Sequence, residues 1–128
     1  MLKKIGISLL CMAATISTST YAVSKNNILQ AGATIEYELP PNEPQTFSNY
    51  MFWAIEANCK IITEDEGDVF YAVAVAKKGK LNGIPWSKGD ALRVTVHNGE
   101  NLKINADSGA SVKITNEGAH LVRAICSN

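Results

Sequence analysis

The sequence ALRVTVHNGENLKINADSGASVKITNEGAHLVRAICS, residues 91–127, carries the clearest structural pattern in the chain. Apolar and polar residues alternate in it, first at Leu92, Val94 and Val96 and then at Leu102, Ile104 and Ala106. A period of two is typical of a strand with one buried face. Residues that favour tight turns interrupt the alternation at 98–99, 107–109 and 116–118. The segment therefore predicts four short strands, the first two of which form a hairpin through Asn98-Gly99.

The same alternation extends upstream of this segment. Two stretches place apolar residues on one face: residues 33–39 with Ala33, Ile35, Tyr37 and Leu39, and residues 50–63 with Trp53, Ile55, Ala57, Cys59 and Ile61. Residues 69–76 are rich in valine, and the charged residues 64–68 before them predict a hairpin with the preceding strand. Asn82-Gly83 predicts a further tight turn. The prolines and polar residues at 40–49 indicate a surface loop.

These signals together define a fold class. About seven short strands follow one another with turns between them, and no window has helical periodicity. We therefore expect an all-β protein, a small antiparallel β-sandwich or partly open barrel. No internal repeat or low-complexity linker divides residues 23–128, so they are expected to form a single domain.

The first 22 residues have the pattern of a cleavable signal peptide. Lys3 and Lys4 precede an apolar stretch at residues 5–16, and a polar segment of small residues then ends at Ala22. This order is typical of a secretory signal, and the apolar stretch is too short to cross a bilayer. We predict cleavage after Ala22, so the intact mass of the exported protein should correspond to a chain that begins at Val23. A full-length chain recovered from the cell envelope would contradict this prediction.

The cysteines agree with export. Cys11 belongs to the segment that is removed, which leaves Cys59 and Cys126 in the mature chain. Two cysteines with none left over in an oxidising compartment predict one disulfide. Strand alternation places both cysteines on the faces that carry the apolar residues, which agrees with a buried bridge. Redox catalysis is the alternative for such a pair, but catalytic cysteines usually lie two residues apart at the start of a helix.

Composition excludes several classes of function. The chain has twelve Lys and Arg against twelve Asp and Glu. Removal of Lys3 and Lys4 leaves ten basic and twelve acidic residues, a net charge of about −2. The longest basic run is Lys77-Lys78, so nothing indicates nucleic-acid binding. No apolar stretch is long enough to span a membrane, and we expect no membrane insertion after the signal is cleaved.

The residues suited to catalysis or metal binding do not form a known motif. His97 is expected on the polar face of a turn and His120 at the half-buried start of the last strand. The acidic residues 64–68 lack the spacing of a calcium loop, and no spacing suggests zinc. Lys77, Lys78 and Lys80 have two interpretations, a site for an anionic partner or soluble surface. We therefore expect no cofactor, no metal and no enzymatic activity, with an unrecognised envelope enzyme as an alternative.

A group of aromatic residues is the best candidate for a binding surface. Phe47, Tyr50, Phe52 and Trp53 fall within seven residues. Strand alternation assigns Trp53 to the core and places Tyr50 and Phe52 on the opposite face, beside the expected loop at 40–49. Large rings on a rigid sheet are common anchors of protein interfaces. Phe47, Tyr50 and Phe52 are therefore predicted to contact a partner, unless the loop or a second sheet covers them.

One family shares short motifs with this chain. Residues 39–44, LPPNEP, followed by Tyr50 and Trp53, resemble the first binding loop of the chagasin-like cysteine-protease inhibitors, and Ile84-Pro85-Trp86 resembles their Arg-Pro-Trp loop. The chain lacks the Thr-Thr-Gly of the first loop and has Ile84 in place of arginine. The resemblance implies a small secreted β-sandwich that inhibits proteases, and it adds Trp86 to the candidate partner-binding residues.

The sequence thus predicts a small exported protein, periplasmic or secreted, that works as a non-catalytic binding module. Its partner is expected to be a protein or another component of the envelope. Protease inhibition and an unrecognised enzymatic activity are the alternatives.

Overall fold

The computed structural model describes residues 25–29, 32 and 34–127, so the expected signal peptide lies outside the described residues. The described part is all-β, with eleven strands. In chain order they are β2 (Lys25–Ile28), β3 (Ile35–Leu39), β4 (Gln45–Ser48), β5 (Ile55–Ile62), β6 (Asp68–Ala76), β7 (Lys78–Leu81), β8 (Ile84–Ser87), β9 (Ala91–Val96), β10 (Asn101–Ala106), β11 (Ser111–Asn116) and β12 (Val122–Ser127).

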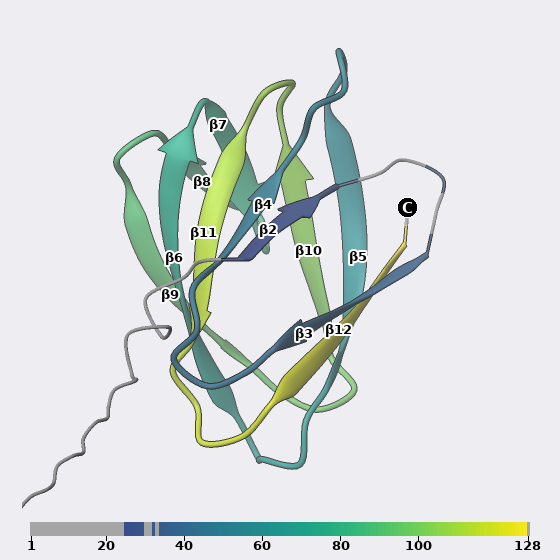
Figure 1. Ribbon diagram of the computed structural model, residues 1–128, viewed down its shortest axis with the longest axis vertical. Coiled ribbons are helices and arrows are strands. Elements are labelled where there is room, and N and C mark those ends of the chain that lie inside the picture. Colours follow the sequence, from purple (N-terminus) through teal and green to yellow (C-terminus); the bar gives the residue numbers. More distant parts are fainter. Residues whose placement is uncertain (1–24, 30–31, 33, 128) are drawn as a thin grey trace, which may run out of the picture.

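The strands form two sheets that pack face to face (Figure 1). One sheet has six strands in the order β3-β12-β5-β10-β7-β8, and the other has five in the order β2-β4-β11-β6-β9. All pairs of neighbours are antiparallel except β2 and β4. The core lies between the sheets and takes buried side chains from both, such as Ile61 and Phe70. The predicted antiparallel β-sandwich is therefore confirmed, with more strands than the seven expected.

The connections define a jelly roll. The chain passes from one sheet to the other at almost every turn, so that β3, β12, β5 and β10 face β4, β11, β6 and β9. This arrangement of eight strands in two four-stranded layers is that of a jelly roll. The β7–β8 pair and β2 extend the two sheets at their edges.

Strand alternation predicted the buried faces well. Tyr37 and Leu39 are buried in β3, and the four apolar residues of β5 at positions 55, 57, 59 and 61 are all buried. In the 91–127 segment, strands β10, β11 and β12 also bury alternate residues, as predicted. A period of two leaves one face of each strand for the core, which is why this part of the prediction holds.

The predicted hairpins were mostly wrong. Strand β5 belongs to the six-stranded sheet and β6 to the five-stranded sheet, so residues 63–67 cross between sheets. Asn98-Gly99 does the same between β9 and β10, although Gly99 has the positive φ of 84° that the turn signal implies. Only Asn82-Gly83 joins strands that pair with each other, β7 and β8. A tight turn fixes a reversal of the chain, but the packing of the two sheets decides which strand becomes its neighbour.

The predicted loop at residues 40–49 was also wrong in part. Its second half forms β4, in which Gln45, Phe47 and Ser48 are buried. The polar members of this strand are satisfied internally, since the Ser48 and Ser111 hydroxyls form a 2.7 Å hydrogen bond and Gln45 donates to the Glu38 carbonyl. Buried polar residues with partners in other strands carry no hydrophobic signal, so alternation alone missed β4.

The disulfide between Cys59 and Cys126 is present. The two residues lie directly opposite each other on β5 and β12, and both are buried in the core. The bridge joins β5, an inner strand of the six-stranded sheet, to its neighbour β12 near the end of the chain. The two cysteines are separated by 67 residues in the sequence.

Candidate functional site

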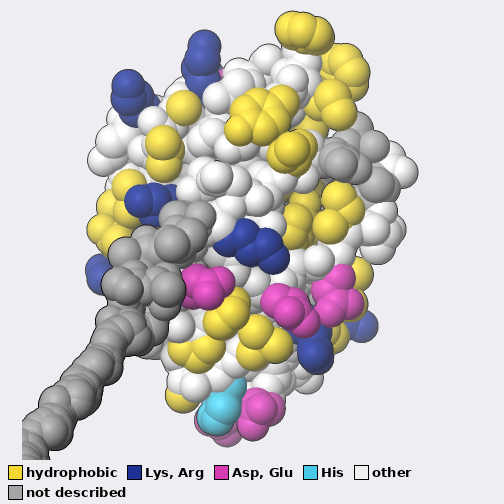
Figure 2. Space-filling view, in the orientation of Figure 1, with side chains coloured by type: hydrophobic (Ala, Val, Ile, Leu, Met, Phe, Trp, Pro, Cys, Tyr) yellow, Lys and Arg dark blue, Asp and Glu magenta, His cyan; other side chains and the backbone are white. Residues whose placement is uncertain are grey.

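The two ends of the sandwich carry different side chains. Strand β11 runs between the ends. At its start, the Asn49 amide donates to the Ala110 carbonyl, and at its finish the Asn42 amide donates to the Asn116 carbonyl. Figure 2 shows hydrophobic side chains gathered at the end where Figure 1 places the β4–β5 connection, and a histidine with acidic side chains at the opposite end.

The β4–β5 connection, residues 49–54, presents three aromatic rings to solvent, and we refer to it as the aromatic loop. Phe52 is 93% exposed, Tyr50 68% and Trp53 55%. The exposure of Tyr50 and Phe52 agrees with their predicted position, but Trp53 is not in the core as predicted. The strand begins only at Ile55, so the alternation of β5 does not extend back to Trp53.

Asn49 holds the aromatic loop in place. This side chain is fully buried, and its Nδ2 donates to the carbonyls of Trp53, Ala106 and Asp107 at 2.9, 3.0 and 3.2 Å. Its Oδ1 accepts a 2.8 Å hydrogen bond from the Met51 amide. The two hydrogens on Nδ2 thus serve three carbonyls, and one side chain joins the loop to the β10–β11 connection.

Ser108 adds a further contact between these connections. Its hydroxyl donates to the Met51 carbonyl at 2.6 Å, and the side chain of Met51 packs against the core. The exposed rings are therefore carried by a loop whose backbone is fixed on both sides, and they lose little conformational freedom when they contact a ligand.

A groove adjoins the aromatic loop. It consists of two depressions, of about 530 Å³ and about 650 Å³, that share Ala54, Lys78, Ser87 and Asp107. The larger depression is lined by Phe52 and Trp53. Two of the three rings of the aromatic loop, Phe52 and Trp53, therefore form one wall of the groove. We refer to the aromatic loop and the groove together as the loop-and-groove surface.

The remaining part of the groove lies on the outer face of the six-stranded sheet. Side chains in register across neighbouring strands line it, with Asn105 of β10 opposite Lys80 of β7 and Lys80 opposite Pro85 of β8. Side chains in register stand beside one another on one face of a sheet. The groove thus extends from the rings of the loop across three strands.

Gly79 shapes the floor of this groove. A Cβ at position 79 would overlap the Asn105 carbonyl oxygen and would lie 2.6 Å from Cζ2 of Trp86, the residue opposite it in β8. The missing side chain lets the Trp86 indole pack against β7 beneath the groove. Trp86 is only 2% exposed as a result.

Two of the predicted partner-binding residues lie in the core. Phe47 is 4% exposed and packs edge-on against Tyr37 with 5.1 Å between ring centroids, because β4 turns this side chain inward. Trp86 supports the groove but offers almost no surface to a partner. The accessible aromatic residues at this end are Tyr50, Phe52 and Trp53.

The structure does not bring together the segments that resemble the chagasin-like inhibitors. Residues 40–44 lie at the Asn116 end of β11, where Pro41 pairs with Asn116, whereas Tyr50 and Trp53 lie beyond its other end. The Ile84-Pro85-Trp86 segment is a strand rather than a loop. Residues 40–44 are therefore separated by the length of the sandwich from Trp53 and from the Ile84-Pro85-Trp86 strand, which both lie along the groove.

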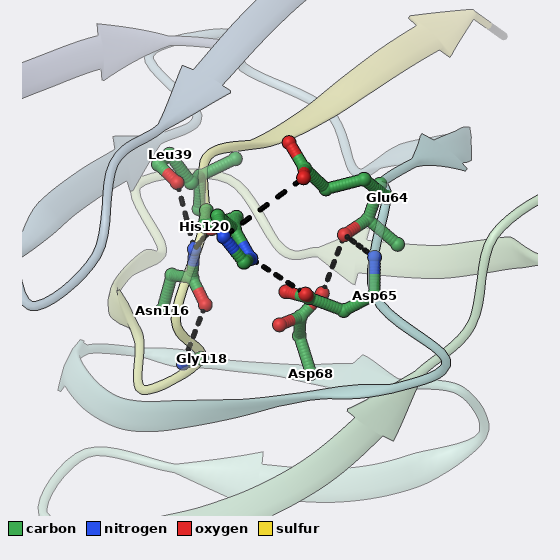
Figure 3. A network of polar contacts seen from close by, with 8 residues as sticks. Leu39, Glu64, Asp65, Asp68, Asn116, Gly118 and His120 are labelled. Atoms are coloured by element: carbon green, nitrogen blue, oxygen red, sulfur yellow. Dashed lines mark hydrogen bonds and ion pairs between the residues drawn. The ribbon is translucent and has the colours of Figure 1, made fainter.

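A network of polar side chains occupies the opposite end (Figure 3), and we refer to it as the carboxyl–histidine cluster. His120 Nδ1 lies 2.6 Å from the Asp65 carboxylate, and its Nε2 lies 3.9 Å from Glu64. The Thr63 hydroxyl donates to Asp68 at 2.7 Å. Asp68 is only 2% exposed. A Cβ at position 118 would overlap its Oδ1, so the absence of a side chain at Gly118 leaves room for the Asp68 carboxylate.

The members of this cluster shift one another's pKa values. A hydrogen bond shared with Asp68 and a second one with His120 lower the pKa of Asp65. Burial raises the pKa of Asp68, and the hydrogen bond to Asp65 raises it further. The hydrogen bond and the negative charge of Asp65 raise the pKa of His120. The cluster thus favours the protonated form of Asp68 and the charged forms of Asp65 and His120.

These shifts predict how stability depends on pH. A histidine whose pKa is raised by folding stabilises the protein fully below its unfolded value of about 6.5 and loses that contribution as the pH rises through the folded value. Asp68, with a raised pKa, acts in the same direction from a lower pH. We expect the melting temperature to fall as the pH rises above about 6.5, the unfolded value of histidine. His120→Gln should show a smaller fall, and an equal fall in both proteins would contradict the assignment.

Neither histidine forms a catalytic arrangement with a nucleophile in the described part of the chain. His97 is exposed and lies 3.1 Å from Glu100, three residues later in the same turn. His120 is also more exposed than the half-buried position predicted for it, because β12 begins two residues after it. Among the described residues, no group of three or more His, Cys, Asp and Glu side chains is arranged to hold a metal ion.

Comparison with known proteins finds no relative of this chain: no family model, no curated protein and no solved structure matches it. The site must therefore be interpreted from its own residues. Of the two ends, the loop-and-groove surface combines a hollow with exposed rings and polar side chains, which is the composition of a ligand-binding site.

Proposed function

We propose that this protein is a non-catalytic binding module that recognises its partner through the loop-and-groove surface. The observation that supports this most is the exposure of Tyr50, Phe52 and Trp53 on a loop that buried Asn49 fixes in place. Burying a large ring stabilises a fold by about 1.5–3 kcal/mol. Three exposed rings at one end forgo that stabilisation, and such a patch usually marks an interaction site.

The alternatives have less support. Protease inhibition rests on segments that lie at different ends of the sandwich or in a strand. The two histidines, which the sequence offered for acid–base chemistry, lie at the end away from the groove, near Glu100 and Asp65. The acid–base groups that line the groove are the carboxylates of Asp90 and Asp107, and Asp90 is engaged by hydrogen bonds from Ser87. An inhibition assay against papain-type proteases tests the first alternative. Activity screening of the His97→Gln and His120→Gln variants tests the second.

The proposed binding module is also expected to be exported from the cytoplasm. The disulfide indicates a compartment that is not reducing. Among the described residues, no helix is long and apolar enough to cross a membrane. With the signal-peptide pattern of residues 1–22, these observations favour a periplasmic or secreted location. The expected partner is accordingly a component of the envelope or of the medium.

Substitution of the exposed rings tests the proposed function. We expect Tyr50→Ala with Phe52→Ser to leave the melting temperature nearly unchanged, because exposed rings contribute little to stability, and to abolish capture of partners from the native envelope and extracellular fraction. Removing an interface anchor typically costs about 2 kcal/mol or more of binding, roughly thirtyfold in affinity.

A matched control is available at the far end of β5. Ile62 is 36% exposed and is the last residue of β5, whereas the aromatic loop precedes its first residue, Ile55, so Ile62→Ser should retain capture. If the double variant unfolds, or if it captures the same partners as the wild type, the aromatic loop is not the recognition site.

A further inference from the structure

We propose that the ligand of the loop-and-groove surface is an acidic glycan, a chain of sugar rings that carry carboxylate groups. This inference rests on the proposed function and specifies the class of ligand. It depends on three features of the surface: the size of the hollow, the pairing of rings with polar side chains, and an excess of unpaired lysines.

The hollow is large enough for a chain of sugar rings. Its two depressions, of about 530 Å³ and about 650 Å³, adjoin each other and share Ala54, Lys78, Ser87 and Asp107. Sites for small molecules commonly enclose about 300–1,000 Å³. Each depression by itself falls within this range, and together they extend from Phe52 to Pro85, so the hollow has room for more than one sugar ring.

The aromatic wall suits sugar rings. A pyranose has a face of C–H groups that packs flat on an aromatic ring, whose π-electrons attract the slightly positive hydrogens. Its hydroxyl groups lie around the rim and need both donors and acceptors. Phe52 and Trp53 supply the apolar face of the groove, and Tyr50, the third exposed ring of the loop, adds a hydroxyl of its own.

The polar lining supplies both donors and acceptors. Asp90, Asp107 and Asn105 offer oxygens, while Lys78 and Lys80 offer ammonium donors. Asp90 is held in a fixed position, since its Oδ2 accepts hydrogen bonds from the Ser87 amide at 2.8 Å and the Ser87 hydroxyl at 3.2 Å. Fixed acceptors beside flexible donors match the mixed hydrogen-bonding needs of hydroxyl groups.

The charge of the groove points to an acidic ligand. Lys77, Lys78, Lys80 and Lys88 line it, against only two carboxylates, Asp90 and Asp107. In the described part of the chain, the ion pairs involve Arg93, His97, Lys103, His120 and Arg123 and none of these four lysines. A mature chain of net charge about −2 thus concentrates unpaired positive charge at its groove.

Two other classes of partner fit the surface less well. A peptide added as a strand would pair with the free edge of β8, but Pro85 lies in that strand and has no amide hydrogen to donate. A flat anionic bilayer would contact the protruding rings but not the side chains within the concave groove. Both classes are outcomes of the test below.

The test measures binding of the mature, disulfide-bonded protein to defined polymers by affinity electrophoresis and calorimetry. The probes are polygalacturonate and alginate as acidic glycans, dextran as a neutral glycan, polyglutamate as an acidic chain without sugar rings, and vesicles of phosphatidylglycerol. We expect binding to at least one of the two uronate polymers, and weak or no binding to the other three probes.

Variants then assign the contacts. Tyr50→Ala with Phe52→Ser should weaken binding of the uronate polymer about thirtyfold. Lys78→Ala with Lys80→Ala should weaken it about three- to tenfold and reduce its dependence on salt. Lys113→Ala, an exposed lysine of β11 in the other sheet, is the matched control and should bind as the wild type does.

Several results would overturn this inference. Binding to neither uronate polymer, equal binding to dextran, or equal binding to polyglutamate would each show that the groove does not recognise an acidic glycan. Binding to vesicles alone would replace the glycan with a lipid surface. The proposed function is judged separately, since loss of native partners from the aromatic-loop variant would uphold the binding site even when every uronate polymer fails.

Discussion

Replacing both Cys59 and Cys126 by alanine is expected to lower the melting temperature by about 10–20 °C. The bridge closes a loop over 67 residues and joins two buried positions that face each other on β5 and β12. A constraint of that length on the unfolded chain contributes roughly 2–4 kcal/mol, and each 1 kcal/mol shifts the midpoint of a domain this small by about 4–8 °C. Thermal unfolding followed by circular dichroism measures the effect.

Alanine at both positions avoids a buried hydroxyl, so the loss reports the bridge and a small cavity. Reduction of the wild-type protein is the control, because it removes the bridge without changing the side chains. We expect the reduced protein to melt close to the double variant. Alkylation of both thiols in the native purified protein would show that the bridge does not form.

The second large effect is expected at Asn49. Replacing it with alanine leaves the carbonyls of Trp53, Ala106 and Asp107 and the amide of Met51 without their side-chain partner. Each buried polar group that loses its hydrogen bond costs about 1–3 kcal/mol, with water compensating for part of the sum. We expect Asn49→Ala to cost about 3 kcal/mol of stability and to weaken partner binding as well, since the aromatic loop loses its anchor.

Asn58→Ala is the matched control for this variant. Asn58 is an exposed asparagine in β5 and points away from the core, so its replacement should leave both stability and binding nearly unchanged. Denaturant unfolding gives the stability and capture of native partners gives the binding. If Asn49→Ala is as stable as the control, then the hydrogen bonds of Asn49 do not hold the loop.

Much of the fold could be predicted from alternation in the sequence. The faces of β3, β5 and β10 were assigned correctly because a strand with one buried face repeats every two residues. Which strands pair with each other could not be predicted in the same way. Asn82-Gly83 joins paired strands and Asn98-Gly99 joins strands of different sheets, yet the two dipeptides are identical. The difference comes from how the two sheets pack, which no local signal records.

The candidate site was predictable in part for similar reasons. The exposure of Tyr50 and Phe52 agrees with the expected face, although they lie in a loop rather than a strand. Trp53 escaped the alternation because the hydrogen bonds of Asn49 turn the chain before β5 begins. The groove could not be predicted from the sequence, because its lining residues lie far apart in the chain and meet only where β7, β8 and β10 pair. The sequence indicates Lys77, Lys78 and Lys80 as a candidate site for an anionic partner. Their position near Phe52 and Trp53 follows only from the arrangement of strands in the six-stranded sheet.

The most direct measurement is photo-crosslinking from the aromatic loop. A benzophenone amino acid is incorporated in place of Phe52, which is 93% exposed, and in a second protein in place of Ile62, at the end of β5 away from the aromatic loop. Benzophenone inserts into C–H bonds of proteins, glycans and lipids alike, so the result does not depend on the class of partner. After irradiation in the native envelope and extracellular fraction, position 52 should yield a discrete adduct by mass and position 62 should not. No adduct at position 52, or equal adducts at both positions, would contradict recognition through this end of the sandwich.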